Sequence, residues 1–367
     1  MINVLKLNSI SKKVNDVLTD GYALSDDCKN PDAVLVRSFA MHEWEAPNTL
    51  QCVARAGAGV NNIPCDEYAK KGIVVFNTPG ANANAVKELV IGALLIACRN
   101  IFEGNTWANG LTGDDVKKQV EKGKSQFAGT EILGKTIGIL GLGAIGRKVA
   151  VACNALGMNV VGYDPFLSDA AKAEIPFANV YATMDEVFAN SDFITLHMPY
   201  LPETKNLINV DSIAKMKDGV IIINAARGEL VNIADMKAAL TNGKVRKYVV
   251  DFPDGDCLNV KGIIAIPHLG ASTEEAEDNC AIMAAKEIKA YMEEGNVINS
   301  VNLPNLTVAK GGKHRVGVIY KGKLGKVNGN VTTSSKGEYN YSIVDSDAEI
   351  DVNAISADEL IKVRVVY

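Results

Sequence analysis

Short apolar runs alternate with polar, helix-like segments over residues 1–90. The runs at 2–7, 33–36, 51–54 and 73–76 predict strands, because each is rich in apolar residues and ends in turn-forming ones. The segments between these runs, such as 65–71, predict helices. Strands that alternate with helices in this way predict a parallel sheet that is covered by helices on both faces.

A second alternating unit begins at Lys135. Before it, the pattern predicts a long amphipathic helix over 85–99 and a polar, glycine-containing excursion over 103–131, across the surface or onto a partner subunit. The second unit contains six candidate strands with helices between them, at 136–140, 159–163, 193–197, 220–224, 248–251 and 263–266. This is the pattern of a complete doubly wound nucleotide-binding domain. A further long helix is predicted over 273–294 and ends at Gly295.

The last part of the chain has a different pattern. Residues 301–310 predict a linker, because Pro304 interrupts any helix there. Beyond the linker, apolar and polar residues alternate as they do in strands, at 315–320, 338–344 and 362–367. This tail is basic as far as Lys326 and acidic from Glu338, which is typical of a solvated module; a binding patch is the alternative.

The length of 367 residues predicts two or three domains. With 47% hydrophobic and 22% charged residues and a net charge of −5, the chain is typical of a soluble globular protein rather than a nucleic-acid- or membrane-binding one. The seven cysteines form no CxxC pair and the four histidines are far apart, so neither a disulfide scaffold nor a metal site is expected. The N-terminus lacks the features of a signal peptide, and no run approaches the ~18 apolar residues of a membrane span. A cytoplasmic protein is therefore expected.

A glycine-rich segment, TIGILGLGAIGR at 136–147, carries the pattern GxGxxG on Gly141, Gly143 and Gly146. In dinucleotide-binding domains the first glycine permits a tight turn, the second lets the backbone approach the pyrophosphate, and the third allows close packing of helix on strand. The pattern alone is also compatible with an ordinary strand–turn–helix. Asp164 ends the next predicted strand, and an acid at that point accepts hydrogen bonds from ribose hydroxyls and repels a 2′-phosphate. The predicted cofactor is therefore NAD rather than NADP.

Arg227 and His268 each follow a predicted strand, at the edge where open α/β sheets bind their ligands. A guanidinium can hold a carboxylate and a carbonyl oxygen together, and an imidazole titrates near neutral pH, as a proton carrier requires. Asp254 or Asp256, in the segment DFPDGDC between them, could hydrogen-bond the imidazole and raise its pKa. The alternatives are a surface arginine that caps a loop, a structural histidine and solvated turn aspartates. Together with a NAD site, these residues predict hydride exchange with a small 2-hydroxy acid.

Six motifs resemble those of the D-isomer-specific 2-hydroxyacid dehydrogenases. They follow the order of that family over most of the chain: RAGAGVNNI at 55–63, NTPGANANAVKEL at 77–89, GKTIGILGLGAIGRKVA at 134–150, LHMPYLPETKNLI at 196–208, NAARGELV at 224–231 and PHLGASTEEAEDN at 267–279. The resemblance implies an α/β fold with two Rossmann-like, doubly wound parallel-sheet domains. Residues 1–93 and 272–303 would form the substrate-binding domain, and 94–271 the NAD-binding domain. The tail, 304–367, resembles a reduced ACT-like α+β module used for packing or assembly, since most of the first ACT helix is missing.

The same resemblance implies a role for each matching residue. Arg227 would bind the substrate carboxylate and carbonyl, and His268 would accept the hydroxyl proton during oxidation. The family's spacing between its arginine and its catalytic glutamate places the glutamate at Asp256. Aspartate is shorter by roughly 1.5 Å, which leaves Asp254 as the alternative. The implied cofactor contacts are Gly141, Gly143, Ala144, Ile145, Gly146, Asp164, His197, Pro199, Thr204, Ala225, Asp251 (at the nicotinamide amide) and Gly270.

The resemblance also implies a substrate-binding role for the first domain. A phosphorylated substrate would need positive charge at its far end, and Arg37 and Arg55, each at or just past a predicted strand end, can provide it. The implied substrate-binding residues are Arg37, Ser38, Arg55, Gly57, Gly59 and Arg227. These features predict NAD-dependent oxidation of 3-phosphoglycerate. For the arginines, the alternative is that they are exposed and held in salt bridges. For the whole protein, the alternatives are a reductase for glyoxylate, hydroxypyruvate or a related 2-oxo acid, and a non-catalytic NAD(H)-sensing adaptor. The resemblance also implies a homodimer or homotetramer assembled through 95–130, with no nucleic-acid or membrane partner.

Overall fold

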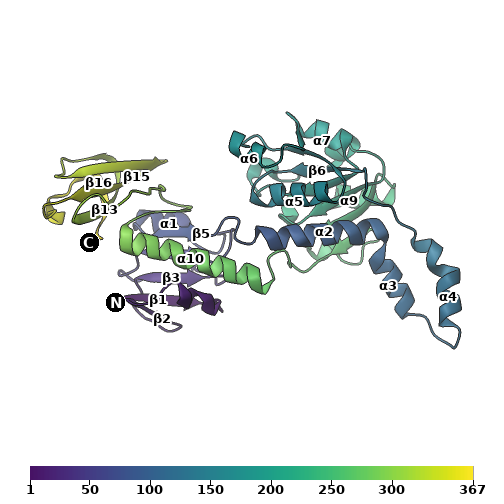
Figure 1. The fold of residues 1–367 in the computed structure, drawn as a ribbon, viewed down its shortest axis with the longest axis horizontal. Coiled ribbons are helices and arrows are strands. Elements are labelled where there is room, and N and C mark those ends of the chain that lie inside the picture. Colours follow the sequence, from purple (N-terminus) through teal and green to yellow (C-terminus); the bar gives the residue numbers. More distant parts are fainter. Residues whose placement is uncertain (367) are drawn as a thin grey trace. The chain divides into compact units, whose positions relative to one another are not determined.

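The structure, a computed structural model, describes residues 1–366. The chain forms two compact units: the first comprises residues 1–82 together with the residues from Glu274 onward, and the second comprises Ala83–Thr273. Both are drawn in Figure 1, where the chain runs from purple through green to yellow. The sequence pattern placed the junctions near 93 and 272, whereas helix α2 (Ala83–Arg99) belongs as a whole to the second unit. Among the described residues, no helix is both long and apolar enough to cross a membrane.

The first unit contains a five-stranded parallel sheet in the order β2-β1-β3-β4-β5. The strands are β1 (Ile2–Leu7), β2 (Tyr22–Ser25), β3 (Ala33–Val36), β4 (Cys52–Arg55) and β5 (Val74–Asn77). The predicted strands are all present, two of them shifted by one residue, and β2 is additional. Every residue of β3 is buried, as expected for a central strand of a parallel sheet. Helix α10 (Glu274–Glu294) packs on this sheet through Ala284 and Ile288, and the short helix α1 (Cys65–Lys70) contributes Ala69 to the same core.

The second unit contains a seven-stranded parallel sheet in the order β12-β11-β10-β9-β6-β7-β8. Its strands are β6 (Thr136–Leu140), β7 (Asn159–Tyr163), β8 (Asn179–Val180), β9 (Phe193–Leu196), β10 (Val220–Asn224), β11 (Val245–Val250) and β12 (Ile263–Ala265). All six predicted strands are present, and β8 is a further, very short strand. The strand order reverses between β6 and β9, and open α/β sheets bind their ligands at such a switch point.

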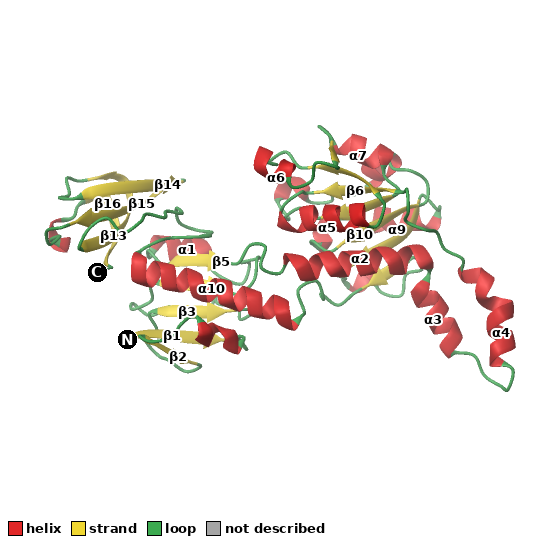
Figure 2. Cartoon of the chain, in the orientation of Figure 1, coloured by secondary structure: helices red, strands yellow, loops and turns green. Residues whose placement is uncertain are grey.

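Helices cover both faces of the second sheet. The helices are α2, α5 (Ala144–Ala155), α6 (Asp169–Ala173), α7 (Met184–Asn190), α8 (Val210–Ala214) and α9 (Ile233–Thr241). Strand β10 shows the two faces clearly: Ile221 and Ile223 lie in a core with α2 and α5, whereas Ile222 lies in a second core with α7, α8 and α9. The predicted doubly wound sheet is therefore confirmed (Figure 2).

The segment that leads from α2 to β6 is largely helical. It contains α3 (Ile101–Asn109) and α4 (Val116–Gly123), neither of which has a buried residue. The Trp107 ring lies 5.2 Å from that of Phe127, which packs the segment on itself. Ile101 and Phe102, in contrast, are about half exposed. The polar excursion predicted here thus contains two helices with apolar side chains on their surface.

The C-terminal residues form a four-stranded antiparallel sheet in the order β14-β15-β13-β16. The strands are β13 (His314–Leu324), β14 (Asn330–Lys336), β15 (Tyr339–Ser346) and β16 (Ala357–Val365). All three predicted tail strands are therefore present, and Tyr367, which ends the last of them, lies outside the described residues. The described tail contains a single 3-10 turn, Val352–Ala354, but no α-helix, so the helical part of the expected α+β module is missing from it.

Two arginines attach this sheet to the end of α10. Buried Arg315 forms a double ion pair with Asp345, through Nε and Nη2 at 2.7 Å each, and donates to the Glu294 carbonyl at 2.9 Å. Arg364 of β16 donates to the main-chain carbonyls of Tyr291 and Met292. These carbonyls belong to the last turn of the helix, where cations are favoured by unpaired C=O groups. The C-terminal sheet is therefore an integral part of the first unit.

Candidate active site

The glycine loop between β6 and α5 has the backbone geometry that the sequence predicts. Gly141 has a φ of +93°, and a Cβ there would lie 2.6 Å from the His197 carbonyl oxygen. A Cβ at Gly146 would collide with the Gly141 carbonyl, so only glycine lets α5 begin this close to the loop. A Cβ at Gly143, in contrast, would meet nothing within 4 Å. The loop is therefore closed toward the protein and open on the side of Gly143.

The first turn of α5 offers unpaired N–H groups on that open side. Gly143 is the N-cap of the helix, and no side chain caps it. The first four amides of a helix have no intrahelical acceptor, and here Ala144 and Ile145 carry two of them. An open cradle lined by such donors fits the pyrophosphate of a dinucleotide, which would lie at the positive end of the helix.

Asp164 lies next to the glycine loop, just beyond the end of β7. Its Oδ2 accepts a hydrogen bond from the Leu142 amide at 2.8 Å, and its Oδ1 accepts one from the Phe166 amide at 2.9 Å. These bonds fix the carboxylate beside the loop, and each oxygen keeps a second lone pair for an incoming hydroxyl. The position fits a partner for the ribose hydroxyls of NAD, and its charge opposes a 2′-phosphate.

The loop after β9 forms the other side of the switch point. The His197 Nε2 lies 3.0 Å from the Thr195 hydroxyl, whereas its Nδ1 is buried without a hydrogen-bond partner. Burial lowers the pKa of His197 to about 4, so the ring is neutral at physiological pH. Thr204 shapes the loop, because its hydroxyl donates to the Pro199 carbonyl at 2.9 Å and accepts from the Leu201 amide at 2.8 Å.

Arg227 follows β10 in the segment NAARGEL. Asn224, at the end of the strand, donates through its side-chain amide to the Arg227 carbonyl at 2.8 Å and accepts from the Ala226 amide at 3.1 Å. Asn224 thereby fixes the turn that carries the arginine. Ala225, between them, packs against the core shared by α2 and α5.

Phe252 connects Arg227 and His268. The Arg227 guanidinium carbon lies 5.0 Å from the centroid of the Phe252 ring, and the His268 ring lies 4.2 Å from it at an angle of 43°. A guanidinium and an imidazole thus contact the same aromatic ring at the carboxyl edge of the sheet. Phe252 was not among the residues predicted for the site. Its place just after the buried strand β11, at the carboxyl edge of the sheet, is the signal that could have indicated a role there.

Asp251 organises the loop that carries His268. Asp251 is 2% exposed, and its two carboxylate oxygens accept from the amides of Leu269 at 2.7 Å and Gly270 at 2.8 Å. Its carbonyl accepts from the His268 amide at 3.0 Å, and His268 itself has a φ of +53°. Burial raises the pKa of Asp251, while the two amide bonds and the charge of His268 act in the opposite direction. The structure therefore couples this acid to the histidine loop.

The two aspartates proposed from spacing have other partners in the structure. Asp256 is exposed and forms an ion pair with Lys237 at 3.1 Å. Asp254 caps the 3-10 turn Gly255–Cys257 by accepting from the amides of Asp256 and Cys257. These contacts stabilise the turn, and a role for either carboxylate beside His268 stays a prediction.

Apart from Arg227, the residues predicted to bind substrate lie in the first unit, at the carboxyl ends of β3 and β4. Arg37 forms an ion pair with Glu277 of α10 at 2.7 Å, and its carbonyl accepts from the Arg55 Nε at 3.1 Å. A Cβ at Gly57 would lie 2.7 Å from an Arg55 guanidinium nitrogen, so the loop that continues to Gly59 passes closely over that side chain.

The Arg55 side chain thus packs on the main chain of Arg37. Ser38 lies beside them, and its amide donates to the Asn8 side chain at 3.1 Å.

The chain is similar to known proteins in sequence and in fold. The family model "D-isomer specific 2-hydroxyacid dehydrogenase, NAD binding domain" matches residues 91–270. The chain is 35% identical over 313 residues to the D-3-phosphoglycerate dehydrogenase of Methanocaldococcus jannaschii, covering 83% of this chain and 58% of that protein. It is 39% identical over 253 residues to the hydroxypyruvate reductase of Thermotoga maritima, covering 66% of this chain and 78% of the relative.

Among solved structures, the NAD+-bound 3-phosphoglycerate dehydrogenase of Entamoeba histolytica superposes with a TM-score of 0.66 at 26% identity, covering 82% of this chain and 98% of that one. The chain spans only about half of the length of the phosphoglycerate dehydrogenases that it matches in sequence, 58% and 52% for two archaeal ones. The predicted fold class and the NAD-binding domain are confirmed. These matches show that the chain belongs to the D-isomer specific 2-hydroxyacid dehydrogenase family.

Proposed function

We propose that this protein oxidises 3-phospho-D-glycerate to 3-phosphohydroxypyruvate with NAD as the hydride acceptor, which is the first step of L-serine biosynthesis. The observation that carries the proposal is the contact of Arg227 and His268 with one ring, that of Phe252, at the ligand-binding edge of the NAD-binding sheet. The phosphoglycerate dehydrogenases among the relatives support the choice of substrate. So does the arginine pair Arg37 and Arg55, because a phosphate favours guanidinium partners.

In this proposal Arg227, His268 and Asp251 each have a separate role. The planar guanidinium of Arg227 binds the carboxylate and the C2 oxygen of the substrate, which orients the C2–H bond. His268 accepts the proton of the C2 hydroxyl as the C–O bond becomes a carbonyl. Asp251 positions the histidine through its bonds to the main chain of residues 268–270. NAD, held by the glycine loop and Asp164, would supply the hydride acceptor when bound.

A second candidate function is the reduction of hydroxypyruvate or glyoxylate. It is favoured by the hydroxypyruvate reductase of Thermotoga maritima, of which this chain covers 78%. It is also compatible with the ion pair between Arg37 and Glu277, which occupies part of one guanidinium. The two candidates differ in whether a phosphate contributes to binding.

The test is a substrate panel followed by NADH absorbance. We expect kcat/KM for phosphohydroxypyruvate to exceed that for hydroxypyruvate by about 10- to 150-fold, because charged hydrogen bonds contribute about 1.5–3 kcal/mol. Equal values would favour the reductase instead. His268→Ala should lower kcat at least about 100-fold, as expected for a general base, whereas the control His314→Ala, at the start of β13, should not. NAD-dependent partner binding without turnover would indicate an adaptor and contradict the enzymatic proposal.

We further propose a cytoplasmic homodimer or homotetramer that assembles through 95–130. Exposed apolar side chains support this region as the contact, namely Leu95, Ile101 and Phe102. Ile101→Glu combined with Phe102→Glu should lower the mass measured by light scattering, and an unchanged mass would exclude this surface.

A further inference from the structure

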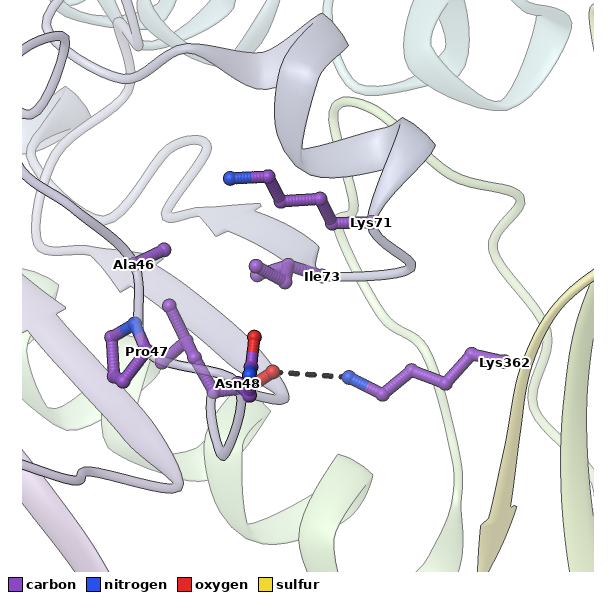
Figure 3. Close-up of a pocket in the computed structure, with 7 residues that line it drawn as sticks. Ala46, Pro47, Asn48, Lys71, Ile73 and Lys362 are labelled. Carbon is purple, nitrogen blue, oxygen red and sulfur yellow. Dashed lines mark hydrogen bonds between the residues drawn. The ribbon is translucent and has the colours of Figure 1, made fainter.

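A cavity of about 300 Å³ lies in the first unit, next to the C-terminal sheet. Three separate segments line it: the loop from Ala46 to Leu50 before β4, the turn that contains Lys71 and Ile73, and Lys362 of β16 (Figure 3). Cavities that bind small molecules start at about this size. This one is formed by two connections of the five-stranded sheet, before β4 and before β5, together with the last strand of the C-terminal sheet.

Lys362 is held in a defined position beside this cavity. Gly72 has a φ of +66°, and a Cβ there would lie 2.8 Å from the Cβ of Lys362 and 3.0 Å from its Cδ. The aliphatic stem of the lysine therefore packs directly on the Gly72 backbone. Its Nζ donates to the Leu50 carbonyl at 3.0 Å, the bond that is dashed in Figure 3. An ammonium has three donors, and this bond uses one of them.

The charge around the cavity is positive. Figure 3 shows the Lys71 side chain extended along the cavity beside Ile73, while Lys362 enters from β16. None of the lining residues is acidic, and Asn48 adds an uncharged amide. Of the neighbouring groups, Arg364 is cationic, and the Cys52 thiol is neutral because burial raises its pKa to about 12.

The surroundings of Lys362 disfavour its charge in the absence of a ligand. Burial lowers the pKa of the ammonium to about 8; Cys52 acts in the opposite direction and the charge of Arg364 in the same direction as burial. An anion in the cavity would compensate both effects and would accept hydrogen bonds from the donors that the Leu50 carbonyl leaves available.

We propose that this cavity binds a small anion, a carboxylate or a phosphate-type oxyanion, between Lys362 and Lys71. A bound anion would contact the C-terminal sheet through Lys362 and the five-stranded sheet through Lys71 and Asn48. Its binding would therefore strengthen the attachment of the C-terminal sheet and make the stability of the first unit depend on the concentration of the anion. The proposal does not depend on the reaction that the protein catalyses.

The experiment measures sulfate binding to the 367-residue chain by calorimetry and by the shift in thermal unfolding. Sulfate keeps its charge between pH 7 and pH 9, so any pH dependence comes from the protein. We compare Lys362→Met and Lys71→Met with the control Lys70→Met, which removes an exposed charge outside the cavity lining. Both cavity variants should weaken one class of sulfate site at least tenfold, and the control should leave it unchanged. Sulfate at the Arg37–Arg55 pair is unaffected by these changes and forms a separate class.

The pH dependence identifies Lys362 specifically. With a pKa of about 8, the charged fraction of Lys362 falls from about nine-tenths at pH 7 to about one-tenth at pH 9. The affinity of the native protein should therefore fall about tenfold over this range, and Lys362→Met should remove that dependence. If Lys362→Met does not fold, Lys71→Met still tests the site, because it leaves the bond to Leu50 intact.

A second titration, with succinate, distinguishes the two ligand chemistries: tighter succinate binding indicates a dicarboxylate, and tighter sulfate binding a phosphate ester. Identical sulfate affinity, stoichiometry and pH dependence in the native protein, Lys71→Met and Lys362→Met would overturn the proposal.

Discussion

Phe252→Leu tests whether the ring that Arg227 and His268 share contributes to the reaction. The substitution removes the aromatic face and keeps an apolar side chain of similar bulk. In the structure the guanidinium lies 5.0 Å from the ring centroid and the imidazole 4.2 Å from it. Both side chains would therefore lose a neighbour that limits their orientation.

The magnitude follows from these two contacts. A cation–π contact contributes about 0.5–2 kcal/mol and an aromatic pair about 0.5–1.5 kcal/mol. If most of this energy positions the two side chains in the transition state, about 1–3 kcal/mol is lost. That loss corresponds to a decrease of about 5- to 150-fold in kcat/KM.

The assay measures kcat and KM for oxidation by NADH formation. Because the ring limits the orientation of both side chains, its removal should lower kcat while KM changes less. Phe252→Tyr keeps the ring and should retain activity. Phe177→Leu, in a loop of the same unit, is the matched control for loss of a ring.

The reasoning is refuted if Phe252→Leu stays within about twofold of the native kcat/KM. A lower melting temperature together with an unchanged kcat would also refute it, because the ring would then have only a structural role.

Three further predictions concern the cofactor, the pH dependence of stability and the tail. Asp164→Ser should lower the preference for NAD over NADP at least about tenfold in kcat/KM, because the charge that opposes a 2′-phosphate is removed. Glu287 is buried and accepts a hydrogen bond from Asn299 at 2.8 Å, and desolvation raises its pKa to about 8. Its contribution to stability is therefore complete below the ordinary glutamate pKa of 4.5 and is lost as the pH rises through 8. Urea unfolding should therefore show that the native protein loses stability between pH 5 and pH 8 relative to Glu287→Gln; equal slopes would contradict this. Arg315→Met should destabilise the first unit by about 3–5 kcal/mol in urea unfolding, because it leaves the Asp345 carboxylate buried without its ion pair; a loss below about 1 kcal/mol would contradict the role of this pair.

The glycine loop and the buried strands could be predicted from the sequence because their determinants are local. The glycine positions depend on backbone geometry at single residues, such as the positive φ of Gly141. The buried strands, such as β10, consist largely of uninterrupted apolar residues. Three strands were missed. Strand β2 is half-exposed, β8 is too short to show a pattern, and β14 is polar and mostly exposed.

The surroundings of Arg227 and His268 were predicted less completely, because they depend on where side chains point within one loop. Counting along the sequence places Asp256 at the family's acidic position, but the 3-10 turn directs its carboxylate to Lys237. The contact of Phe252 with Arg227 and His268, which follow two other strands, has no local signal. Such contacts arise from the order of the strands and not from periodicity.

The division of the chain has a consequence for its synthesis. The second unit is one continuous segment, whereas the core of the first unit combines the N-terminal strands with α10 and with side chains of the C-terminal sheet. During translation, residues 1–82 leave the ribosome before the whole of the second unit, and only then does α10, the helix that covers their sheet, follow. The second unit can therefore fold first, while the N-terminal strands remain unpacked and expose an apolar face. We expect a chaperone to be needed at that stage, and nascent chains arrested before residue 274 to aggregate unless residues 1–82 are removed from them.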